Sequence, residues 1–87
     1  MSYNYTTQRP NLFTEEGQRL FLAVYERTLA LITLSGAVRE QEALHGFAGD
    51  SWDMIACLDR MVELGKIVEV SAKGIHSQYR VFVAAPK

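Results

Sequence analysis

The chain has 87 residues, of which 48% are hydrophobic and 22% charged, and it has a single cysteine. This composition is typical of one folded domain with a modest core and excludes an intrinsically disordered chain. The lone Cys57 excludes an internal disulfide and a cysteine-based metal cluster. The longest apolar run, Leu20–Tyr25, is too short to cross a bilayer, and we expect no secretory leader. These features predict a cytoplasmic protein with no membrane partner.

The net charge of −1 conceals an uneven distribution. Residues 14–64 carry nine acidic and four basic side chains, a net charge of −5, whereas residues 65–87 carry a net charge of +3. The predicted helical body is therefore acidic and the C-terminal part is basic.

Residues 1–13 are polar and aromatic and show neither a helical nor an alternating period. We interpret them as an N-terminal arm that precedes a domain formed by residues 14–87. Arg9 and the tyrosines are candidates for contact with a partner or with a DNA minor groove. The usual behaviour of chain ends favours a frayed terminus instead.

A long helix is predicted from residue 14 to about residue 34. Thr14 suits its N-cap, and Glu15 and Glu16 suit the positive end of its dipole. Eleven of the fifteen residues from Leu20 to Leu34 are apolar, whereas one buried stripe needs roughly three or four in seven. The helix is therefore either central to the core or shared with a second copy, and a homodimer through this helix is our prediction.

A helix-turn-helix pattern follows. Residues 37–45 are predicted to form a short helix, residues 46–49 a glycine-containing break, and Ser51 to cap a third helix that ends at Gly65. Apolar spacing predicts which residues of this third helix point inward. The inward set is Met54, Ile55, Leu58, Met61 and Val62, and the outward set is Trp52, Asp53, Ala56, Cys57, Asp59, Arg60 and Glu63.

Two strand-like runs complete the pattern. Lys66–Ser71 and Gln78–Ala84 are rich in β-branched and aromatic residues, which favour strands. The glycine-bearing segment Ala72–Ser77 between them predicts a β-hairpin.

The third helix runs into the first strand through LDRMVELGKI (Leu58–Ile67), and the second strand contains YRVFV (Tyr79–Val83). With the preceding helices, these segments resemble the winged helix-turn-helix superfamily over about residues 14–84. The resemblance implies an α+β fold of three helices followed by a β-hairpin wing, with the third helix in the recognition position and residues 72–77 at the wing tip. Many members of the superfamily are bacterial or phage transcription regulators, and others are protein-interaction modules.

Transcription-regulatory binding to double-stranded DNA is the first function that this resemblance implies. A DNA interface needs cations near phosphates. The candidates are Arg39 and Arg60 in the helix-turn-helix unit and Lys73 and His76 in the wing. On the outward side of the third helix Arg60 stands against three carboxylates, so the local charge opposes a polyanion.

A protein-interaction module of the same fold, without DNA binding, is the alternative. An exposed Trp52 would suit an interface anchor, with Asp53 and Asp59 facing a basic partner. An indole folded onto Phe47 would instead be a packing residue.

Catalysis is not expected. His45 and His76 lie far apart in the sequence, and neither has metal-ligand spacing with Cys57. The sequence contains no nucleophile elbow, phosphate-binding glycine loop or dinucleotide fingerprint. We therefore predict no enzymatic activity, no metal and no cofactor.

Overall fold

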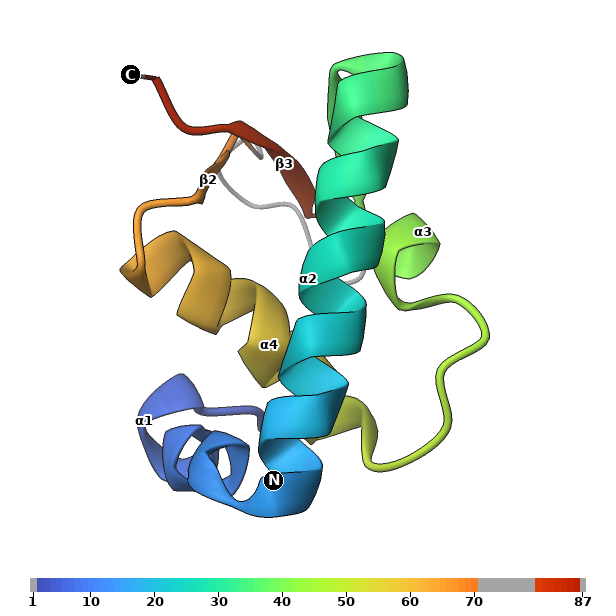
Figure 1. Cartoon of the computed structure of the whole chain (residues 1–87). Coiled ribbons are helices and arrows are strands. Elements are labelled where there is room, and N and C mark those ends of the chain that lie inside the picture. Colours follow the sequence, from blue (N-terminus) through green and yellow to red (C-terminus); the bar gives the residue numbers. More distant parts are fainter. Residues whose placement is uncertain (1, 71–79, 87) are drawn as a thin grey trace.

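The computed structural model describes residues 2–70 and 80–86, which form a mostly helical α+β domain (Figure 1). The elements in chain order are α1 (Tyr5–Gln8), the 3-10 helix η1 (Arg9–Phe13), α2 (Glu15–Ser35), β1 (Ala37–Arg39), α3 (Glu40–Leu44), α4 (Ser51–Glu63), β2 (Ile67–Glu69) and β3 (Val81–Ala84). None of the helices in this described part is long and apolar enough to pass through a membrane.

The long helix α2 begins and ends where the sequence predicts. The Thr14 hydroxyl accepts a hydrogen bond from the Gly17 N–H at 3.0 Å, which satisfies one of the free donors of the first turn. Gly36 follows the last turn with φ of 83°, a left-handed conformation that a Cβ would disfavour.

Most of the large apolar side chains of α2 are buried or half-buried by contacts within the chain. Val24, Thr28 and Ile32 form its buried stripe. Its half-buried apolar side chains that pack against the core are Leu20, Phe21, Tyr25, Leu29 and Leu31. Leu22 and Leu34 remain exposed. The homodimer through this helix stays a prediction.

The segment predicted as a single helix at residues 37–45 is a strand followed by a helix, so the first half of that prediction is wrong. Ala37–Arg39 forms β1, in which Val38 is buried and pairs with Phe82 of β3. α3 occupies only the second half. The β-branched Val38 suits a strand, but the partner that fixes it lies 44 residues further along the chain.

The sheet is three-stranded and antiparallel, in the order β1-β3-β2. β2 and β3 pair as the predicted hairpin does, over shorter stretches than expected. The prediction of a simple C-terminal hairpin is wrong, because β1 comes from between α2 and α3 and occupies the other edge of β3. The predicted wing tip, including Lys73 and His76, lies outside the described residues.

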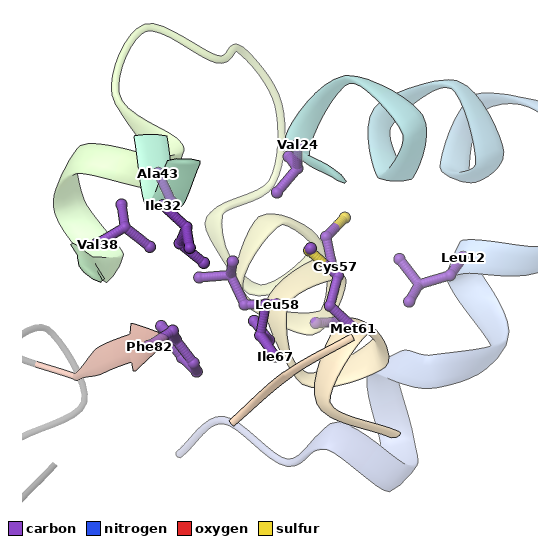
Figure 2. Packing of buried hydrophobic residues seen from close by; sticks show 11 residues of the cluster. Leu12, Val24, Ile32, Val38, Ala43, Cys57, Leu58, Met61, Ile67 and Phe82 are labelled. Carbon is purple, nitrogen blue, oxygen red and sulfur yellow. The ribbon is translucent and has the colours of Figure 1, made fainter. Parts of the chain in front are cut away.

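Almost every element contributes to one core, which is centred on α4 (Figure 2). Figure 2 shows Cys57, Leu58 and Met61 of α4 between Leu12 on one side and Val38 on the other. The buried apolar residues are Leu12, Val24, Ile32, Val38, Ala43, Ala56, Cys57, Leu58, Met61, Ile67 and Phe82.

The N-terminal segment (residues 2–13) is part of the folded domain, so a frayed terminus is the wrong interpretation. Its helices α1 and η1 pack beside α4 and the start of α2 (Figure 1). Leu12 is 1% exposed. The approach to α2 is so close that a Cβ at Gly17 would lie 2.1 Å from the Asn11 carbonyl oxygen.

Because this segment adds a second covering layer, α4 is buried on more than one side. Ala56 and Cys57, predicted to point outward, are fully buried. Burial raises the pKa of the Cys57 thiol to about 12, so the thiol stays protonated and unreactive near neutral pH.

Candidate functional site

The candidate site is the surface of α4 and its neighbour α3, because α4 holds the predicted recognition position. Asp50 is the N-cap of α4, and its Oδ1 accepts from the Trp52 N–H at 2.8 Å, so the predicted cap at Ser51 is wrong by one residue. Gly65, with φ of 74°, follows the helix as predicted.

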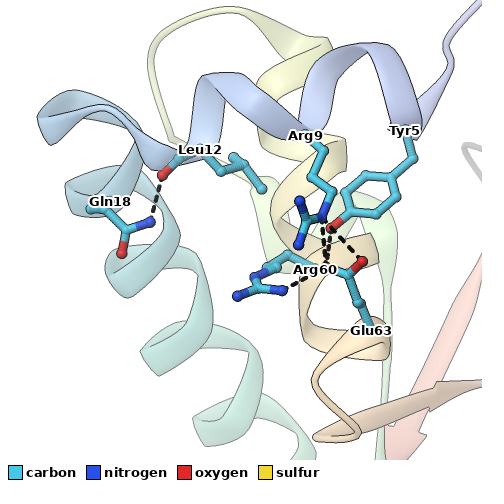
Figure 3. A network of polar contacts seen from close by, with 6 residues as sticks. All are labelled: Tyr5, Arg9, Leu12, Gln18, Arg60 and Glu63. Atoms are coloured by element: carbon cyan, nitrogen blue, oxygen red, sulfur yellow. Dashed lines mark hydrogen bonds and ion pairs between the residues drawn. The ribbon is translucent and has the colours of Figure 1, made fainter.

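The N-terminal segment covers one side of α4 and is hydrogen-bonded to it at Glu63 (Figure 3). We call this the clasped side of α4. Glu63 Oε1 accepts from the Tyr5 hydroxyl at 2.8 Å, from Arg9 Nε at 3.0 Å and from Arg60 Nη1 at 2.6 Å. The hydrogen bonds from Arg60, then Arg9, then Tyr5 lower the pKa of Glu63 to about 2. This carboxylate is therefore ionised and engaged within the chain.

Asp59 joins the N-terminal segment to the sheet. Its Oδ2 accepts from the Tyr3 hydroxyl at 2.6 Å, and its Oδ1 accepts from Arg80 Nη2, also at 2.6 Å. The same Arg80 nitrogen lies 2.7 Å from Glu69 Oε1. Burial works to lower the pKa of Arg80, but the hydrogen bonds to Asp59 and Glu69 raise it above its ordinary value. This partly buried network fixes the geometry of the clasped side.

The cations predicted to contact DNA are placed apart. Arg60 lies on the clasped side, where it pairs with Glu63 and its guanidinium stacks 5.1 Å from the centre of the Phe13 ring. Arg39 is at the end of β1, with 66% of its side chain exposed and its Nε 3.3 Å from Glu42. Lys73 and His76 lie outside the described residues.

The residues predicted for protein interaction also face the N-terminal segment. Trp52 is half-buried and lines a pocket with Ser2, Asn4, Thr7 and Gln8. Asp53 accepts a hydrogen bond from Asn11 Nδ2 at 3.1 Å, and Asp59 is held as described above. The acidic, tryptophan-bearing side of α4 is thus largely occupied by the chain itself.

A groove between α3 and α4, which we call the α3–α4 groove, was not found by sequence reasoning. It has a volume of about 260 Å³ and is lined by Glu40, Gln41, Leu44, His45, Ser51, Met54 and Ile55. Apolar spacing predicts that Met54 and Ile55 point into the core, but both are only half-buried. Helical periodicity finds apolar residues on one side of a helix, but it does not distinguish a core from an open groove.

Glu40 is the chemically unusual residue of this groove. It is 5% exposed, and its Oε2 is buried with no hydrogen-bond donor among the described residues. Burial raises the pKa of Glu40 to about 7, the charges of Asp59 and Glu69 add to the effect, and the charge of Arg80 opposes it. In the sequence this glutamate resembles an ordinary solvated residue at a helix start, so nothing there signals its burial.

Comparison of the chain with protein-family models, with curated proteins and with solved structures gives no match.

Proposed function

We propose that the protein is an interaction module of the winged helix-turn-helix type that binds a segment of another protein in the α3–α4 groove. The succession of α2, β1, α3, a turn, α4 and the antiparallel pair of β2 and β3 supports this fold type. The additional strand β1 makes the sheet three-stranded and shortens the first helix of the predicted helix-turn-helix unit to α3.

The observation that carries the proposal is the chemistry of the groove. Leu44, Met54 and Ile55 give it apolar walls, and none of the described residues that line it is a lysine or arginine. A face that reads DNA needs donors to base edges and cations near phosphates. A concave apolar surface with a polar rim is instead typical of sites that bind peptides or small ligands.

Selection of binders from a random peptide library, followed by amide chemical-shift mapping on the folded chain, tests this function. We expect selected peptides to shift the amides of α3 and the first half of α4. Ile55→Asp, which places a charge in the groove wall, should weaken their binding by tenfold or more, and Leu22→Asp, on an exposed part of α2, should leave it unchanged. Peptides that bind elsewhere, or that bind I55D as well as the wild type, would contradict the proposal.

DNA binding through the sheet and wing is the second candidate function, and the exposure of Arg39 favours it. Arg39 pairs with Val81, the first residue of β3, and the chain just before β3 contributes Lys73 and His76 to the basic C-terminal part. Random duplex DNA would then bind with an affinity that falls as salt rises. Arg39→Ala and Lys73→Ala should each weaken that binding and reduce the salt slope by about one. An unchanged slope in both variants would remove this candidate.

A further inference from the structure

The α3–α4 groove combines apolar walls with one buried carboxyl group. Met54 and Ile55 belong neither to the buried core nor to the half-buried side chains packed against it, so their apolar surface is open to an occupant. Glu40 lines the same groove from α3. An occupant of this groove therefore meets both a hydrophobic wall and an acid.

One oxygen of the Glu40 carboxyl group, the buried Oε2, has no hydrogen-bond donor among the described residues. Among the described residues, Arg80 is the cation whose charge lowers the pKa of Glu40. Its guanidinium is already hydrogen-bonded to Asp59 and to Glu69. The charge of Arg80 therefore reaches Glu40, but among the described residues Arg80 hydrogen-bonds to the other two carboxylates and not to Glu40.

We propose, resting on the protein-interaction function above, that the partner segment places a lysine or arginine side chain beside a bulky apolar side chain. The apolar side chain contacts Met54 and Ile55, and the cationic N–H groups donate to the Glu40 carboxylate. An unpaired buried carboxylate is costly, and hydrogen bonds between ionised groups are roughly twice as strong as neutral ones, so a cation satisfies this site better than an amide does. The net charge of −5 on residues 14–64 favours a basic partner in the same sense.

Two short probes test this chemistry: the blocked tripeptides acetyl-Leu-Lys-Leu-amide and acetyl-Leu-Gln-Leu-amide, titrated against the labelled chain at pH 7.5. We expect the lysine peptide to shift the amides of residues 40–45 and 51–55 and to bind about tenfold more tightly than the glutamine peptide. The difference should vanish in Glu40→Gln and persist in Glu26→Gln, which removes an exposed carboxylate of α2. The comparison of the two peptides on the wild-type chain needs no variant, so the test stands even if E40Q fails to fold.

Equal binding of the two peptides in the groove would overturn the assigned partner chemistry and leave the groove as an interaction surface. Failure of the interaction function itself would appear separately, as library peptides that do not map to the groove. Tighter binding of isopentylammonium than of the lysine peptide would assign the site to a small amine. Identical shifts on raising the protein concentration alone would assign it to a second copy. Either result overturns the proposal.

Discussion

The carboxyl groups of Glu40 and Glu63 behave oppositely because their surroundings in the fold differ. Glu63 accepts hydrogen bonds from three side chains and stays ionised, with its pKa lowered to about 2. Glu40 is buried, one of its oxygens receives no hydrogen bond from the described residues, and its pKa is raised to about 7. The first stabilises the fold in its charged form and the second opposes its own ionisation.

Glu40→Gln should change how stability depends on pH. The pKa of Glu40 rises from the ordinary 4.5 to about 7 on folding, so the folded state holds the proton more tightly. The free energy of unfolding of the wild type therefore falls as pH rises from about 4.5 to about 7. Relative to the wild type, E40Q should gain on the order of 2 kcal/mol between pH 5 and pH 8, as measured by urea unfolding. An equal difference at both pH values would show that the carboxyl is not perturbed.

Glu63→Gln should loosen the N-terminal segment. Since the pKa of Glu63 is lowered on folding, its contribution is present above about pH 4.5 and is lost as pH falls toward 2. At pH 7 we expect lower hydrogen-exchange protection for the amides of residues 5–9 in E63Q than in the wild type. Glu15→Gln, which breaks an exposed ion pair on α2, is the matched control. Unchanged protection in E63Q would mean that the ion pairs do not hold the segment.

Elements whose signals are local could be predicted from the sequence, and elements that depend on distant partners could not. α2 and α4 are marked by apolar periodicity and by end signals such as Thr14 and Gly65. β1 needs its pairing with β3, and η1 needs the cover that Leu12 finds beside α2 and α4. Neither partner can be recognised from the few residues around each element, so local patterns predict a helix at residues 37–39 and an arm at residues 1–13.

Gly17→Ala tests the contact between η1 and α2. Alanine is the better helix former by about 1 kcal/mol, so helix propensity alone predicts a gain in stability. The new Cβ would meet the Asn11 carbonyl oxygen at 2.1 Å and the Leu12 Cα at 2.7 Å, and both are backbone atoms. We expect a net loss of about 1–3 kcal/mol in thermal or urea unfolding. Ala30→Gly, on an exposed part of α2, measures the effect of helix propensity alone on the free energy of unfolding. A G17A variant more stable than the wild type would contradict the packing of η1 against α2.

In the whole molecule, residues far apart in the chain decide which surface is free. The charges on α4 could be recognised from the sequence, but their partners could not, because Tyr3 and Asp59 are separated by 56 positions and Arg9 and Glu63 by 54. The N-terminal segment thus occupies the acidic side of α4, and the α3–α4 groove remains open. The proposed function follows from this division of the helix into a clasped side and a free side.

Titration of the labelled chain with a random duplex of about 20 base pairs at about 50 mM salt tests this division most directly. Non-specific DNA affinity is strongest at such low salt. We predict that the amides of α3 and α4 do not shift, because the N-terminal segment covers the predicted reading face and none of the described residues that line the α3–α4 groove is a lysine or arginine. Saturable shifts along α4 that disappear as salt is raised would contradict the account and would return the helix to a DNA-reading role.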